Sequence, residues 1–136
     1  MSASVRIRRE ILAQLRDEAA KTPAEECCGL LAGRDEIITV IFPARNAHAN
    51  PASAYEIAPQ ELFQLMREMR ARNWRLLGIY HSHPHGENRP SPRDIAQAFY
   101  PDTPYLILSP LPNAPHPVRA FRIRNGEVTE LKIEAL

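Results

Sequence analysis

The sequence predicts an α/β domain in which helices pack on a mixed β-sheet. Two segments, residues 8–21 and 59–72, carry apolar residues at the spacing of an amphipathic helix. Short apolar runs alternate with them, and two pairs of runs are joined by tight turns, one of them at Asn125-Gly126, as in β-hairpins. A chain of 136 residues has the usual length of one domain, so we expect residues 1–136 to form a single domain.

The individual elements follow from local patterns. Strands are predicted where short apolar or β-branched runs are bounded by turn residues, at 27–32, 36–42, 53–57, 76–82, 105–108, 120–124 and 128–133. A third, short helix begins after Ser91 and carries Ile95, Ala98 and Phe99. The first helix is expected to cover the sheet.

Composition excludes several classes of partner. The formal charge is +1, from 17 basic and 16 acidic residues, which favours neither a nucleic-acid surface nor an anionic membrane surface. No apolar run has the length needed to span a bilayer. Cys27 and Cys28 are adjacent and poorly placed for an ordinary disulfide. We therefore expect a cytoplasmic protein that binds neither nucleic acid nor membrane; its oligomeric state is left open.

The strongest chemical signal lies at the end of the strand predicted at residues 76–82. His81 and His83 are two residues apart, so their imidazoles share one face of the strand, and Ser82 points to the other. Asp94 follows eleven residues after His83, enough chain for a loop to return its carboxylate to the pair. Two nitrogens and one carboxylate oxygen, with a fourth position for water, make up a catalytic zinc site.

The segment around the third ligand allows other interpretations. His85 and Glu87 lie in the same loop and are alternatives to Asp94 as a ligand. Residues 91–94, Ser-Pro-Arg-Asp, also have the pattern of a helix capping box, which accounts for the acid without a metal. The two roles are compatible, because a carboxylate in the first turn of a helix has a fixed direction.

A zinc-bound water also needs a base to accept its proton. Glu25 and Glu26, just before the first predicted strand, are the candidates. Taken alone, an acid at the start of a strand is most simply a solvated residue.

Three segments together resemble the signature of the JAMM metallopeptidases, the catalytically competent branch of the JAB/MPN domain family. They are residues 26–33 (ECCGLLAG), 81–84 (HSHP) and 91–94 (SPRD). The signature is an upstream Glu, then His-Ser/Thr-His, seven residues, Ser, two residues and Asp, and this chain matches every spacing. The resemblance implies a curved mixed sheet flanked by helices, in the cytidine-deaminase-like arrangement of JAB/MPN domains.

The resemblance also implies a role for each motif residue. The implied ligands of one zinc ion per chain are His81, His83 and Asp94. Glu26, rather than Glu25, is implied to be the general base, and Ser91 is implied to stabilise the oxyanion of the tetrahedral intermediate. Ser82, which points away from the ligands, is expected to make a supporting hydrogen bond.

The implied activity is hydrolysis of a peptide or isopeptide bond by a metal-activated water. Relatives act after the Gly-Gly tail of ubiquitin or ubiquitin-like proteins, and the short chain resembles the small prokaryotic members, some of which process sulfur-carrier proteins. Loops 46–54 and 110–117 are candidate walls of a substrate groove, or plain connectors. Two alternatives remain: a non-catalytic scaffold that binds proteins, and a zinc amidohydrolase acting on a small molecule.

Overall fold

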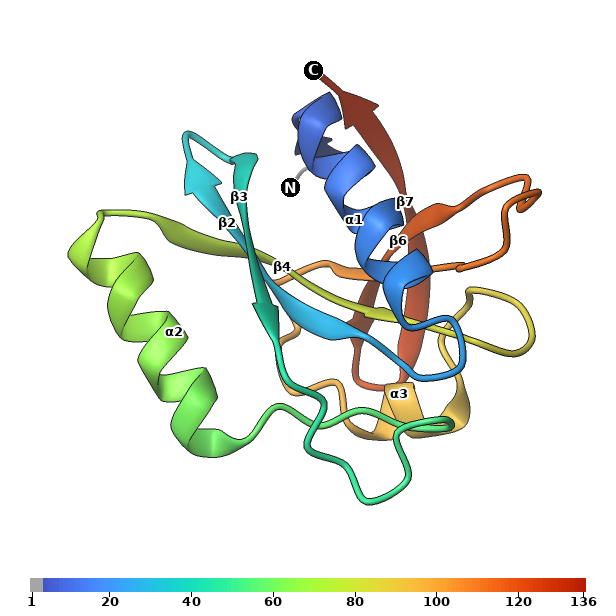
Figure 1. The fold of residues 1–136 in the computed structure, drawn as a ribbon. Coiled ribbons are helices and arrows are strands. Elements are labelled where there is room, and N and C mark those ends of the chain that lie inside the picture. The colour runs from blue at the N-terminus through green and yellow to red at the C-terminus, as the bar shows by residue number, and fades with distance from the viewer. Residues whose placement is uncertain (1–3) are drawn as a thin grey trace.

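The computed structural model describes residues 4–136, which form one continuous sheet with three helices around it (Figure 1). The strands are β1 (Ser4–Ile7), β2 (Cys28–Arg34), β3 (Ile37–Ala44), β4 (Arg75–Ser82), β5 (Tyr105–Leu108), β6 (Val118–Arg124) and β7 (Glu127–Ala135). The helices are α1 (Arg9–Lys21), α2 (Pro59–Ala71) and α3 (Pro92–Ala96). In this part of the chain no helix combines the length and apolar character needed to cross a membrane.

The sheet is mixed, as predicted, and it closes on itself. Its strand order is β1-β3-β2-β4-β5-β6-β7, and β1 also pairs with β7. Strand β2 is antiparallel to β3 and β4, β4 is parallel to β5, and β5, β6 and β7 are antiparallel in turn. The closing strand β1, parallel to both β3 and β7, was not predicted, because four residues are too few to give a pattern.

Both predicted hairpins are present. The turn between β2 and β3 is made by Asp35 and Glu36, which have positive φ angles of 56° and 60°. The turn between β6 and β7 is made by Asn125 and Gly126, with φ angles of 50° and 81°. Positive φ at both central residues gives a turn whose twist matches the strands, which is why Asn-Gly predicts this hairpin well.

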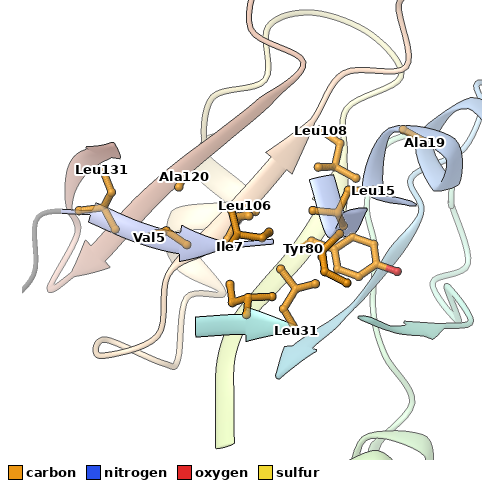
Figure 2. Close-up of a cluster of buried hydrophobic side chains, with 12 residues drawn as sticks. Val5, Ile7, Leu15, Ala19, Leu31, Tyr80, Leu106, Leu108, Ala120 and Leu131 are labelled. Carbon is orange, nitrogen blue, oxygen red and sulfur yellow. The ribbon is translucent and has the colours of Figure 1, made fainter. Parts of the chain in front are cut away.

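The central strands are buried on both faces. Leu31, Tyr80 and Leu106 pack with the inner face of α1 in one cluster, which Figure 2 shows around the ring of Tyr80. Their strand neighbours Leu30, Ile79 and Tyr105 point the other way, into a second cluster with α2. A strand covered on both faces has a continuous apolar run instead of an alternating one, which accounts for the sequence of β4.

Two local predictions were wrong. Residues 53–57 form no strand; they belong to a loop that joins β3 to α2. Helix α3 ends at Ala96, so Ala98 and Phe99 both lie beyond it, and Phe99 is 71% exposed. Ile57 and Ala98 pack against the second cluster and Phe99 lies at the surface, so both segments carry apolar residues without forming a longer element.

Candidate metal centre and active site

Three side chains converge beyond the end of β4. The Nε2 atoms of His81 and His83 are 3.1 Å apart, and Oδ2 of Asp94 lies 3.2 Å from the first and 3.0 Å from the second. Strand alternation puts His81 on the same face as Ile79, where α2 and α3 lie. His83, the first residue beyond the strand, returns to that face. The structure therefore brings both imidazoles and the predicted carboxylate to one point.

The spacing of these atoms fits a small metal ion. A tetrahedral ion bound at about 2.0–2.2 Å separates its ligand atoms by about 3.3–3.6 Å, so shifts of a few tenths of an ångström would complete the shell. Both histidines are buried and Asp94 is partly buried, and together they offer two imidazole nitrogens and a carboxylate oxygen. His85 and Glu87, the alternatives to Asp94, are exposed and lie outside the group.

The carboxylate of Asp94 is held by the start of α3. Its Oδ2 accepts a hydrogen bond from the N–H of Ser91 at 2.9 Å, and its own N–H donates to Oγ of Ser91 at 3.1 Å. This is the predicted capping box, and it aims the same oxygen at the imidazoles. Burial raises the pKa of Asp94, but hydrogen bonds from His81, His83 and Ser91 outweigh it and hold the pKa well below its usual range.

The two imidazoles are oriented by different means. Nδ1 of His83 donates to the carbonyl of Glu87 at 2.8 Å, which turns Nε2 toward the site. Nδ1 of His81 is buried and has no hydrogen-bond partner within residues 4–136. Instead, the ring of Tyr55 stacks on the His81 ring, with centroids 4.5 Å apart and planes 19° apart. Sequence patterns gave no signal for Tyr55, which lies in the segment predicted as a strand.

Sheet register brings Glu26 to the face that carries His81 and His83. Cys28 is opposite His81 in the antiparallel pair β2–β4, and the N–H of Ser82 donates to the carbonyl of Cys27 at 3.0 Å. Continuing this register puts Glu26 opposite His83 and on the same face, whereas the exposed Glu25 falls on the other.

Glu26 is buried, and its carboxyl group has a raised pKa. The residue is 7% exposed, and Oε1 has no hydrogen-bond partner among the described residues. Burial, together with the negative charge of Asp94, raises the pKa of Glu26 to about 7, against the opposing effects of His83 and Arg93. A carboxyl group with a pKa near neutrality and a free acceptor oxygen is suited to accept and return a proton.

Ser82 points away from His81, His83 and Asp94, as expected. Its Oγ accepts a hydrogen bond from the N–H of Cys27 at 2.9 Å and lies 3.5 Å from the carbonyl of Glu25. Both partners flank Glu26. Ser82 therefore fixes the segment that carries the acid, rather than any ligand.

A hollow of about 340 Å³ adjoins Asp94. Buried Leu30 and Ile79 are in its lining, along with aromatic residues from two loops and from the start of β5. At its polar side Arg93 contacts Nε2 of His48 at 2.7 Å, which connects α3 to the 46–54 loop. The other candidate wall, loop 110–117, borders a separate hollow against α1.

Comparison with known proteins agrees with this geometry. The chain is 36% identical over 112 residues to a desampylase of Haloferax volcanii, covering 81% of each protein. It is 36% identical over 125 residues to a probable TtuB-protein conjugate cleaving protease of Thermus thermophilus, covering 92% of this chain and 80% of the relative. The solved structure of a Desulfitobacterium hafniense protein matches with a TM-score of 0.85 at 30% identity, over 96% of this chain and 91% of that one.

A family comparison gives the same result. The family described as prokaryotic homologs of the JAB domain matches residues 8–124, a span that contains Glu26, both histidines, Ser91 and Asp94. The resemblance drawn from the three sequence motifs is thereby confirmed, and the chain belongs to the prokaryotic homologs of the JAB domain.

Proposed function

We propose that this protein is a zinc-dependent peptidase or isopeptidase that cleaves an amide bond at the C-terminal Gly-Gly tail of a ubiquitin-like or sulfur-carrier protein. The observation that carries the proposal is the group formed by buried His81 and His83 and partly buried Asp94, beside a buried Glu26 whose Oε1 has no partner within residues 4–136. The names of the relatives support the substrate class, since one is named a desampylase and another a probable TtuB-protein conjugate cleaving protease.

Zinc is the metal that the donor set favours. Two neutral imidazoles and one carboxylate, with one position open, are typical of catalytic zinc, whereas Mg²⁺ and Ca²⁺ prefer oxygen ligands. Bound zinc would lower the pKa of a water molecule bound to it and would polarise the scissile carbonyl. His81, His83 and Asp94 would hold one ion per chain.

Glu26 and Ser91 supply proton transfer and stabilisation of the oxyanion. Glu26 accepts the proton of the attacking water at its carboxylate and passes it to the leaving amine, for which a pKa of about 7 is well matched. Ser91 accepts the N–H of Asp94 at Oγ, so its hydroxyl proton remains to donate to the oxyanion of the tetrahedral intermediate. The hollow beside Asp94 would receive the chain of the substrate next to the scissile bond.

The test is cleavage of a fusion in which a carrier protein ending in Gly-Gly is joined by a peptide bond to a reporter domain. Mass spectrometry is expected to find a carrier that ends at Gly-Gly, formed with added Zn²⁺ and not with a chelator. The Glu26→Gln variant should bind zinc without cleaving, while Glu25→Gln, one residue away and exposed, should cleave normally.

Two other results would replace this proposal. Stoichiometric zinc binding without cleavage of any carrier fusion or isopeptide conjugate would favour the protein-binding scaffold. Zinc-dependent hydrolysis of small amides, with carrier fusions left intact, would favour a small-molecule amidohydrolase.

A further inference from the structure

The amide of Asn46 connects three backbone segments around the site. Its Nδ2 donates to the carbonyls of Glu26 and Ala54, both at 2.9 Å. Its Oδ1 accepts from the N–H of His48 at 3.0 Å and from that of Glu56 at 3.2 Å. Two carbonyls on the nitrogen side and two N–H groups on the oxygen side determine which way the amide faces.

Two of these hydrogen bonds hold the residues on either side of Tyr55. Ala54 and Glu56 are its neighbours in the chain, so the Asn46 amide fixes the backbone on both sides of the tyrosine. The Tyr55 ring in turn stacks on His81, the ligand whose Nδ1 has no hydrogen-bond partner in the described chain. A metal-binding imidazole is normally oriented by a hydrogen bond at its second nitrogen, so here the stacked ring is the contact that sets the ring plane.

A third bond reaches the acid. The carbonyl of Glu26 accepts from Asn46, and the N–H of Glu26 donates to the carbonyl of Pro51 at 2.8 Å. Both backbone groups of Glu26 are therefore held by the loop that Asn46 organises. The Glu26 carboxyl group therefore extends from a backbone position that these hydrogen bonds hold in place.

We propose that Asn46 is a positioning residue that aligns the acid Glu26 with the metal-binding group. It acts on Glu26 through the Glu26 backbone, and on the ligand His81 through Tyr55. Only the kinetic part of the inference rests on the proposed metallopeptidase activity. The predicted effect of Asn46 on metal binding rests on the contacts alone. Residues that support metal ligands typically alter metal affinity or activity by about 10-fold to 100-fold when they are removed.

The first test compares Asn46→Asp with Asn50→Asp. The aspartate at position 46 keeps the shape but places a carboxylate oxygen against two carbonyls, and the control makes the same change in charge at an exposed position of the same loop. Competition with a chromophoric chelator should give Asn46→Asp a dissociation constant for Zn²⁺ about 10-fold higher than wild type, with Asn50→Asp unchanged. With carrier fusions, kcat should fall about 10-fold to 100-fold while KM changes little.

The second test isolates the contact with His81. Tyr55→Phe keeps the stacked ring and should bind Zn²⁺ as the wild type does, whereas Tyr55→Leu should bind it about 10-fold more weakly. The visible spectrum of bound Co²⁺ should shift in Asn46→Asp and in Tyr55→Leu, because it reports the orientation of the ligands. The effects of Asn46→Asp and Tyr55→Leu on zinc affinity should not add in the double variant.

Several outcomes would overturn the inference. A folded Asn46→Asp with wild-type zinc affinity and kcat would do so, as would equal zinc affinity for Tyr55→Leu and Tyr55→Phe, which is the decisive comparison if Asn46→Asp fails to fold. A wild-type protein that binds zinc but cleaves no carrier fusion would contradict the proposed function instead, and the metal affinities would still test Asn46.

Discussion

Replacing Glu26 by glutamine should make the metal-free protein more stable and the enzyme inactive. Glu26 is only 7% exposed, and its Oε1 has no partner among residues 4–136, so the charged carboxylate is poorly solvated. The pKa of Glu26 is accordingly raised from 4.5 to about 7, chiefly by burial. Glutamine has nearly the same shape and carries no charge at any pH.

The magnitude follows from the linkage between ionisation and folding. Each pH unit between the folded and unfolded pKa corresponds to about 1.4 kcal/mol, so the rise to about 7 gives at most about 3 kcal/mol. Below pH 4.5 Glu26 is neutral in both states and has no such penalty. Between pH 4.5 and 7 the unfolded chain releases the proton while the folded chain keeps it, so stability falls as pH rises. Above pH 7 the full penalty is present.

The assay is urea unfolding of metal-free wild type, Glu26→Gln and Glu25→Gln at several pH values from 4 to 8.5. The free energy of unfolding of Glu26→Gln should match that of wild type near pH 4 and exceed it by about 1–3 kcal/mol at pH 8, while Glu25→Gln should follow wild type throughout. The cleavage rate of Glu26→Gln should fall about 10²-fold to 10⁴-fold. A stability difference that is independent of pH, or a glutamine variant that is less stable at pH 8, would refute the reasoning.

The other predictions concern the ligands, the cap and the core. A chelator should abolish cleavage and added Zn²⁺ restore it, while Asp94→Asn should lose zinc affinity in chelator competition; a variant with unchanged affinity would remove Asp94 from the ligand set. Ser91→Ala should lower stability by about 1 kcal/mol through loss of the cap and lower kcat about 10²-fold to 10³-fold, whereas unchanged kcat would leave the cap as its only role. Gly29→Ala should destabilise the fold by about 1–3 kcal/mol in urea unfolding, because its Cβ would lie 2.5 Å from both the Phe42 carbonyl oxygen and the Tyr80 ring; wild-type stability would contradict this close packing.

Local rules made most of the site predictable. Alternation along a strand sets which face His81 and His83 share, and it needs only the sequence of that strand. The capping box of Ser91 and Asp94 is likewise complete within four residues. The identity of the acid, by contrast, came from the resemblance to a family, because local patterns treat Glu25 and Glu26 alike.

The features that were missed depend on pairing between distant segments. Strand β1 has four residues, and it is held in place by β3 and β7 rather than by a pattern of its own. Tyr55 and Asn46 lie in a loop whose shape is set by side-chain hydrogen bonds to backbone groups, and such bonds leave no periodic signal. Polar residues in loops are common, so a single Asn gives no indication that all four of its hydrogen-bonding positions are used.

Register between β2 and β4 explains why an acid more than fifty residues upstream can be part of a compact motif. The pairs from Cys28–His81 to Gly33–Arg75 hold the two strands together directly. A slip of one residue in this pairing would turn Glu26 to the opposite face and bring Glu25 to the site. Ser82 opposes that slip, because its Oγ binds the N–H of Cys27 directly across the pair. The serine between the two histidines therefore stabilises the register that places Glu26 on the same face as those histidines.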